Sequence, residues 1–222
     1  MYTKTDIAAL LRRYGLHLRA LGKHAVIPFL AVDLLLPVLT ALCLYQSQNP
    51  AEDMLEVLSY LLIILPISCV WHSIMIMKEY LLGSGSELLY VCKTRSRLAD
   101  ALLPFLVMLA NSAVLLGGIS LFIPNQSANW LHLMGVCCFY FGIAYFLLNA
   151  SRSLTLTLMV VLLYTIAAVL SDNFNVQFFL LYFNTFALSD ANLRLYTAFF
   201  FLGALILTLL GEWRARRNEK YT

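Results

Sequence analysis

Long apolar runs separated by short polar stretches dominate the pattern of residues along the chain. A helix of about 20 apolar residues crosses the bilayer core of about 30 Å. Five runs are of about that length, and a sixth, Tyr196–Leu210, is shorter and extends to Trp213. The five are Val26–Tyr45, Leu55–Met77, Ala101–Ile123, Trp130–Leu148 and Leu154–Leu170. The pattern predicts an all-α polytopic membrane protein with six transmembrane helices, forming one transmembrane domain over residues 1–222.

The composition agrees with this fold class. Hydrophobic residues make up 61% of the 222 residues and charged residues 12%, against about 45–50% and about 25% in soluble domains. A water-soluble enzyme, a nucleic-acid-binding domain and a disordered chain are therefore excluded. The cysteines lie in apolar runs and have neither disulfide nor metal-ligand spacing, so we expect small hydrophobes and no metal site. No removable signal peptide is expected either.

Basic residues are concentrated on one side of the predicted spans. With the N-terminus in the cytoplasm, all but one of the 15 Lys and Arg residues fall in inner segments, and only Arg194 lies outside. The first outer loop instead carries Glu52, Asp53 and Glu56. The positive-inside rule then predicts a multi-pass protein of the cell inner or plasma membrane, with both termini and the basic tail 212–222 in the cytoplasm.

Residues 3–23, within an N-terminal segment 1–24, have the pattern of a helix lying on the membrane. Apolar side chains recur at helical spacing and basic side chains occupy much of the remaining surface. The apolar positions are Ile7, Leu10, Leu11, Tyr14, Leu18 and Leu21, and the basic ones are Arg12, Arg13, Arg19 and Lys23. Two interpretations stay open: an anchor that fixes topology, or a helix that also contacts a partner.

The inner loop 78–98 contains a second amphipathic element. Glycines at 83 and 85 break the helix that leaves the second span, and Ser84 and Glu87 form a capping box that starts a short helix over Glu87–Lys93. A basic cluster follows at Lys93, Arg95 and Arg97. Because so short a helix is unstable alone in water, it must dock on a soluble subunit, on the N-terminal helix or on lipid headgroups.

The order of an amphipathic helix, two spans and this loop resembles the permease subunits of ABC type-2 exporters. Those subunits typically carry a Glu, a Gly-Thr or Gly-Ser pair, Glu-Leu-Leu and Ser-Arg in this loop. The matching residues here are Lys78, Glu79, Gly85, Ser86, Glu87, Leu88, Leu89, Ser96 and Arg97. The stretch from Tyr90 to Lys93 departs from the family, which often has an apolar stretch ending at a proline there.

The resemblance implies a role for each segment. The N-terminal helix, with Arg12, Arg13 and Tyr14, would be the elbow helix. Residues near Ser84–Lys93 would form a cytoplasmic coupling helix set in a groove of a separate ABC ATPase subunit, which would hold ATP and Mg. A second permease protomer, identical or related, would complete the transporter. The residues expected to couple to the ATPase are Glu79, Gly85, Ser86, Glu87, Leu88, Leu89, Arg95 and Arg97.

The segment 171–194 before the last span is unusual by itself. Its apolar run Val176–Phe183 is too short to cross a bilayer and too apolar for an ordinary exposed loop. Polar turn and cap residues flank the run. A re-entrant helix in the outer leaflet fits this pattern and the resemblance, and an amphipathic cap lying flat on the surface is the alternative.

Asp33 is the acidic residue deepest within a predicted span. An ionised carboxylate at mid-bilayer costs at least about 2.5–3.5 kcal/mol, so such a residue normally faces protein or water. Pro28 and Pro37 flank Asp33, and Pro37 lacks the N–H that would bond the carbonyl of residue 33. We expect a kinked, polar point with either a translocation-path role or a structural hydrogen bond to a neighbouring span or second protomer. For His72 and His132, hydrogen bonding at an interface is expected.

Motifs of enzyme chemistry are missing from the sequence. It contains neither the G-x-x-x-x-G-K-[ST] phosphate loop nor H-E-x-x-H, so no catalytic residue is assigned and ATP hydrolysis must come from a partner. The predicted function is the transmembrane permease subunit of an ATP-driven exporter for a lipid, peptide or drug-like substrate, in contact with membrane lipid and not with nucleic acid. The alternatives are a six-span substrate-binding subunit of an uptake transporter and a non-transport membrane immunity protein.

Overall fold

The computed structural model describes residues 4–46, 50–82, 97–121, 127–173 and 190–219. Within these ranges the chain is helical apart from short turns. The first helices are α1 (Lys4–Leu21), a 3-10 turn (Gly22–Ala25), α2 (Ile27–Leu30), a π-helical turn (Ala31–Leu35) and α3 (Leu36–Gln46). They are followed by α4 (Pro50–Leu82), α6 (Arg97–Ser120), α7 (Ser127–Ser151), α8 (Leu154–Asn173) and α9 (Asp190–Glu219).

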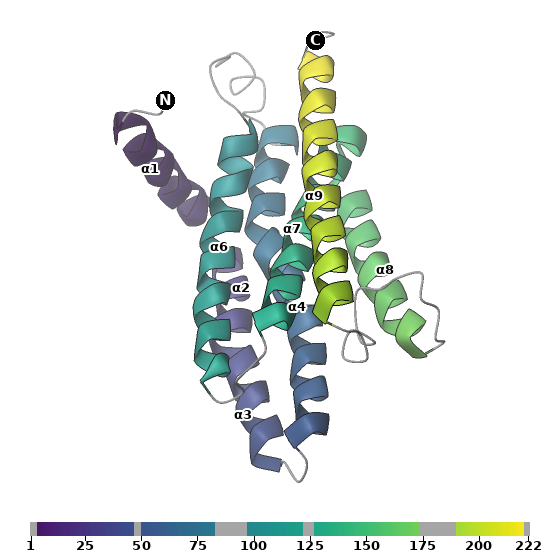
Figure 1. Ribbon diagram of the computed structural model, residues 1–222. Helices are drawn as coiled ribbons and strands as arrows, with labels where there is room; N and C mark the ends of the chain where they lie inside the picture. The colour runs from purple at the N-terminus through teal and green to yellow at the C-terminus, as the bar shows by residue number, and fades with distance from the viewer. Residues whose placement is uncertain (1–3, 47–49, 83–96, 122–126, 174–189, 220–222) are drawn as a thin grey trace.

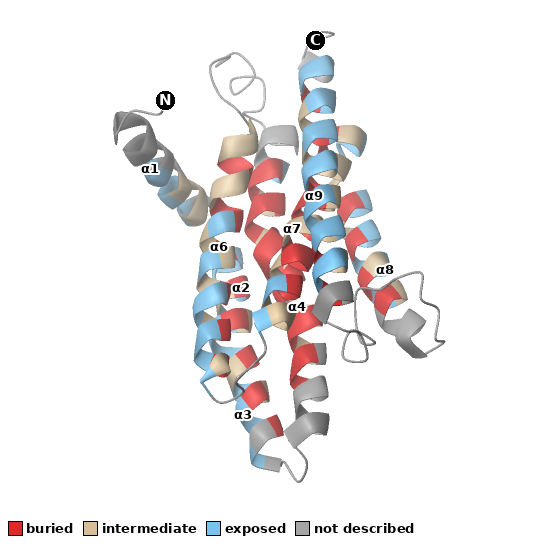
Figure 2. Ribbon diagram, in the orientation of Figure 1, coloured by how far each residue is buried: buried red, intermediate tan, exposed pale blue. Residues whose placement is uncertain are grey.

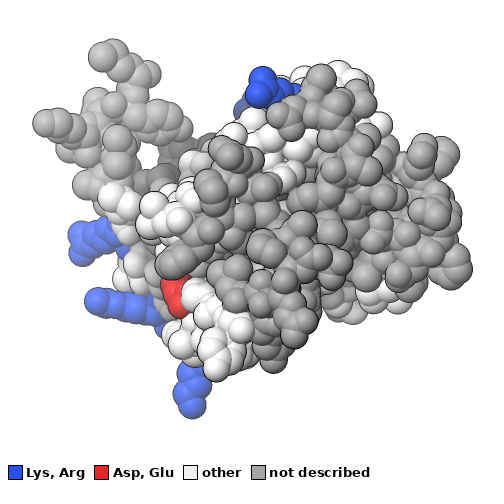
Figure 3. All heavy atoms as spheres, turned by 60° about the horizontal axis from the view of Figure 1, so that its bottom comes forward, with Lys and Arg blue, Asp and Glu red and all other residues white. Residues whose placement is uncertain are grey.

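After α1 the helices run alternately up and down, so that both termini lie at the same end of the molecule (Figure 1). The end of α4, the start of α6 and the turn between α7 and α8 lie there too. We call this end the basic end, because the helix segments that reach it carry Lys23, Lys78, Arg97, Arg152, Arg214, Arg216 and Arg217. At the opposite end, turned toward the viewer in Figure 3, Lys and Arg atoms are visible only at the edges of the outline.

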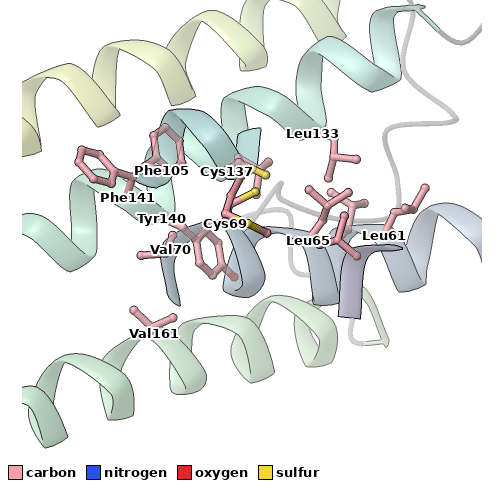
Figure 4. Packing of buried hydrophobic residues seen from close by; sticks show 14 of the residues in the cluster. Leu61, Leu65, Cys69, Val70, Phe105, Leu133, Cys137, Tyr140, Phe141 and Val161 are labelled. Carbon is pink, nitrogen blue, oxygen red and sulfur yellow. The ribbon is translucent and has the colours of Figure 1, made fainter. Parts of the chain in front are cut away.

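Helix α4 is the centre of the fold. It packs against α3, α6, α7 and α8, and it is buried along most of its described length (Figure 2). Leu61, Leu65 and Cys69 of α4 are completely buried. In Figure 4 they lie among Phe105 of α6, Val161 of α8 and the α7 residues Leu133, Cys137, Tyr140 and Phe141. A displacement of α4 would therefore move α3, α6, α7 and α8, which pack directly against it.

Helices α7 and α9 form the closest helix pair, and glycines make the approach possible. A Cβ atom at Gly142 would lie 2.8 Å from the carbonyl oxygen of Ala204, and one at Gly211 would lie 2.8 Å from the Tyr145 ring. Gly203 is similarly close to the Phe139 ring, at 2.9 Å. Small residues let helix backbones approach in membranes, where packing rather than the hydrophobic effect drives association. We call this contact the α7–α9 seam.

Within the described residues, five helical stretches are long and apolar enough to span a membrane. They are Gly22–Cys43, Tyr60–Lys78, Arg97–Ser120, Ser127–Ser151 and Leu193–Arg217. A multi-pass membrane protein of all-α class is thus confirmed in outline. The remaining predicted span, Leu154–Leu170, corresponds to α8, whose apolar part Leu154–Ala168 is shorter, so a count of six stays a prediction.

Some helices extend beyond the predicted spans. The last helix continues past Trp213, where the predicted span ends, and through the arginines at the basic end. Long Arg side chains extend toward the membrane surface from helix ends, which lets a helix include them. Helix α7 begins at Ser127 and ends at Ser151, so it extends beyond the predicted span Trp130–Leu148 at both ends. Arg152, with φ of 53°, makes the tight turn into α8.

The predicted coupling helix Ser84–Lys93 lies outside the described residues, and with it Gly85, Ser86, Glu87, Leu88, Leu89 and Arg95. Most of the predicted re-entrant segment, including Val176–Phe183, also lies outside them. The N-terminal amphipathic segment is a helix, α1, as the periodicity predicts.

Candidate functional site

The two stems of the inner loop 78–98 are packed against each other at the basic end. Helix α4 leads into the loop and contains Glu79, while Arg97 is the first residue of α6, which leaves it. The Ser73 hydroxyl of α4 donates to the Ala101 carbonyl of α6 over 2.8 Å, and both residues are buried. The loop is therefore attached to two helices that are fixed to each other just below it.

A polar cluster joins α7 and α9 beside these stems. The Tyr145 hydroxyl of α7 donates to Glu212 Oε2 of α9 over 2.7 Å, and Arg216 Nε donates to Glu212 Oε1 over 3.0 Å. Arg97 lies close enough to Tyr145 to interact with it electrostatically. The Asn149 amide, one turn further along α7, donates to the Tyr145 carbonyl over 2.8 Å. This cluster connects the start of α6 to α7 and α9.

The junction between α1 and the first span is fixed by α4. Gly22, with φ of 56°, ends α1, and the 3-10 turn that follows leaves carbonyls free for side chains. Trp71 Nε1 donates to the His24 carbonyl over 3.3 Å, and His72 Nε2 lies 2.8 Å from the Ala25 carbonyl. Since a carbonyl only accepts, Nε2 of His72 carries the proton. The expected hydrogen bonding of His72 is confirmed.

Of the predicted elbow residues, Arg12 is exposed and Tyr14 is half-buried. The Tyr14 hydroxyl is itself buried and finds no hydrogen-bond partner in the part of the chain that the structure describes. Burial raises the pKa of Tyr14 above its usual value, because an ionised phenolate would be poorly solvated there. Arg13 lies on the same helix. Helix α1 contacts α6, so it is connected to the helix that follows the inner loop.

Asp33 lies in the π-helical turn, midway along the first span. The amide of Asn111 on α6 donates to Asp33 Oδ1 over 2.7 Å, and Asp33 is exposed while Asn111 is half-buried. The turn arises next to Pro37, and the Leu36 N–H bonds the Ala31 carbonyl five residues back. The expected break is confirmed, as is a hydrogen bond to a neighbouring span. π-helical turns within α-helices often occur at functional positions.

The remaining polar groups serve packing between helices. His132 Nδ1 lies 3.2 Å from the Thr197 hydroxyl across the α7–α9 seam, which confirms the second histidine expectation. Cys69 Sγ lies 3.4 Å from the Ser112 hydroxyl. Of the described cysteines, Cys43, Cys69 and Cys137 are buried and Cys138 is half-buried. Within the described ranges no group of three His, Cys, Asp or Glu residues could hold a metal ion.

Comparisons with protein-family models, curated proteins and solved structures gave no match for this chain. The arguments for its function therefore depend on its own residues.

Four of the polar residues in these contacts were not predicted from the sequence, namely Tyr145, Asn149, Glu212 and Asn111. Tyr145 and Asn149 are spaced i, i+4 near the inner end of a span, and Glu212 and Arg216 repeat that spacing on the last helix. Polar residues at such spacing share one helix face, so this signal could have marked both helices. The spacing could not have shown that these faces of α7 and α9 contact each other.

We expect the α1–α2 junction to loosen when the His72 contact is removed. His72→Phe keeps a ring against Phe29, whose centroid lies 5.3 Å away, and removes the bond to the Ala25 carbonyl, at a cost of about 1–3 kcal/mol. Trypsin cleavage after the exposed Lys23 should then become faster in detergent-solubilised protein. His72→Gln, which can donate to the same carbonyl, should restore slow cleavage, and equal rates for both variants would contradict a role for this bond.

Proposed function

We propose that the chain is the transmembrane subunit of an ATP-driven exporter similar to the ABC type-2 permeases. Two permease chains, identical or related, pair in the cell membrane, and a separate ATPase subunit docks at the basic end in the cytoplasm. The substrate crosses outward between the protomers and is a lipid, a peptide or a drug-like molecule. The chain performs no catalysis, and the ATPase supplies the sites for ATP and Mg.

The observation that carries this proposal is the attachment of loop 78–98. Its stems α4 and α6 are joined by the Ser73–Ala101 hydrogen bond, and α4 packs against α3, α6, α7 and α8. A force applied to the loop from outside the membrane would therefore reach the whole helical core. A loop that only connected two spans would not require such a rigid base.

The chemistry of the loop favours a protein partner. Glu87, Leu88 and Leu89 offer a charge and two adjacent apolar side chains on one short predicted helix, while Arg95 and Arg97 follow it. Apolar anchors flanked by charges are typical of sites that dock on another protein. In this proposal nucleotide binding closes the ATPases and moves the loops, and α4 transmits the movement to the spans.

Purification from native membranes in mild detergent tests the proposal. The tagged chain should retain a protein that carries a phosphate loop and hydrolyses ATP. Glu87→Lys or Leu88→Asp should lower its recovery by about tenfold or more, as expected when an interface loses a central contact. Glu56→Lys, the same charge reversal near the start of α4 and far from the inner loop, is the matched control and should leave recovery unchanged.

Two results would overturn the proposal. One is that the folded, unmodified chain retains no ATPase under conditions that preserve other membrane complexes. The other is that Glu56→Lys abolishes recovery as strongly as Glu87→Lys does. Retention of a small soluble ligand instead would favour an uptake-type binding subunit, and retention of a secreted toxin or peptide would favour an immunity protein.

A further inference from the structure

The Asp33–Asn111 pair lies on the outer surface of the protomer, midway along two membrane-spanning stretches. Its neighbours along the chain, Leu30 and Leu34, are 53% and 59% exposed. A polar pair in such surroundings is costly in lipid, because hydrocarbon offers no donor or acceptor. Something other than lipid must therefore cover this part of the surface.

The face around the pair is shaped for close approach. On α6, Asn111, Val114 and Gly118 follow one another at spacings of three and four residues, which places them on one side of the helix. A Cβ atom at Gly118 would meet nothing within 4 Å, unlike the glycines of the α7–α9 seam. Among the described residues, Gly118 therefore permits no close contact like those of the seam glycines. We call Leu30, Asp33, Leu34, Asn111, Val114 and Gly118 the Asp33 face.

The pair leaves hydrogen-bonding capacity unused. Asp33 Oδ1 accepts one N–H of Asn111, whereas Asp33 Oδ2, the second N–H of Asn111 and its amide oxygen make no bond within the described chain. The face therefore carries an acceptor and a donor side by side. In a second copy related by a two-fold axis, the free Asn111 N–H would face the free Asp33 oxygen of the first copy. The Asn111 of the first copy would face the Asp33 of the second in the same way, so both copies would gain a hydrogen bond.

We propose that the Asp33 face is the membrane interface between two copies of this chain, held by reciprocal Asn111–Asp33 hydrogen bonds. The inference deepens the proposed function and rests on it, since that function requires a paired permease. Two symmetric bonds and the close approach at Gly118 supply the attraction that apolar contact alone does not provide in lipid.

Cysteine cross-linking in native membranes tests which face pairs. Leu34→Cys should give a covalent dimer on oxidation, and the unmodified chain sets the background. Leu202→Cys, on the 54% exposed Leu202 of α9, is the matched control and should stay monomeric. Cross-linking through Leu202→Cys and not through Leu34→Cys overturns the inference.

The strength of pairing provides a second test. In a dilution series of labelled chains in liposomes, Gly118→Leu and Asn111→Leu should each lower the association constant by about tenfold, as for loss of interhelical bonds or close packing. Ala198→Leu, the same enlargement of a small exposed residue on α9, should leave it unchanged. Gly118→Leu has open space within the protomer, so its unfolding midpoint should stay that of the unmodified chain. Equal association constants for Gly118→Leu and Ala198→Leu overturn the interface.

These measurements separate the two proposals. If Leu34→Cys cross-links while the unmodified chain captures no ATPase, the interface stands and the exporter function fails. If the ATPase is captured while cross-linking proceeds through α9, the exporter function stands and the Asp33 face fails.

Discussion

Replacing Gly142 by valine will separate α7 from α9 and strongly destabilise the protein. A Cβ at this position would lie 2.8 Å from the Ala204 carbonyl oxygen and 3.0 Å from the Ala204 Cα. Both atoms belong to a helix backbone, which cannot move aside as a flexible side chain could. Forcing extra atoms into a packed core costs typically about 1–3 kcal/mol, and we expect valine to reach or exceed the upper value.

Heat-induced unfolding in detergent micelles measures the effect. A loss of about 3 kcal/mol corresponds to a fall in the unfolding midpoint of about 10 °C for a chain of this size. Gly135→Ala and Gly142→Ala form a matched pair on one helix facing one partner. The nearest atom to a Cβ at Gly135 is 3.4 Å away, which is ordinary contact, so only Gly142→Ala should lower the midpoint. Similar unfolding midpoints for the two alanine variants would contradict the close approach of α7 to α9 at Gly142.

Hydropathy alone predicted the helices because each span must contain its own backbone hydrogen bonds in lipid. The runs Leu55–Met77, Ala101–Ile123 and Trp130–Leu148 all fall largely within α4, α6 and α7. The sequence places Arg214, Arg216 and Arg217 in a basic tail after the last span, because charged residues end the apolar run there. In the structure they continue the helix that carries Trp213.

Contacts between helices could not be predicted in the same way. The glycines at 135 and 142 recur at a seven-residue spacing on α7, but nothing in that spacing identifies α9 as the helix they face. Asp33 and Asn111 are 78 residues apart, and a polar residue in a span indicates that a partner exists without indicating which. Pro37 allowed the break beside Asp33 to be predicted, because the N–H that proline lacks would have made a hydrogen bond within the same helix. Local chemistry was therefore predictable, and pairing across the bundle was not.

The second large effect is expected from Tyr145→Phe, which removes the hydroxyl that bonds Glu212. Glu212 is a charged acceptor with only 16% of its side chain exposed, and hydrogen bonds to charged groups contribute about 1.5–3 kcal/mol. Its remaining partner, Arg216, is 73% exposed and four residues away on the same helix, a type of pair that contributes only about 0.3–0.5 kcal/mol. Loss of the tyrosine hydroxyl therefore leaves the carboxylate poorly compensated.

Tyr140→Phe is the matched control for Tyr145→Phe, because it removes a hydroxyl of the same chemistry from the same helix. Tyr140 bonds the neutral Thr165 hydroxyl over 2.8 Å, and Thr165 also donates to the Val161 carbonyl, so it keeps a partner when Tyr140 is changed. The cost should be about 0.5–1.5 kcal/mol, and the unfolding midpoint of Tyr145→Phe should lie below that of Tyr140→Phe. The decisive measurement is a double-mutant cycle with Glu212→Leu, which should give a coupling energy of about 1.5–3 kcal/mol between Tyr145 and Glu212. A coupling near zero would mean that the two side chains do not join α7 to α9, and that the stems of loop 78–98 have no polar connection to the last helix through them.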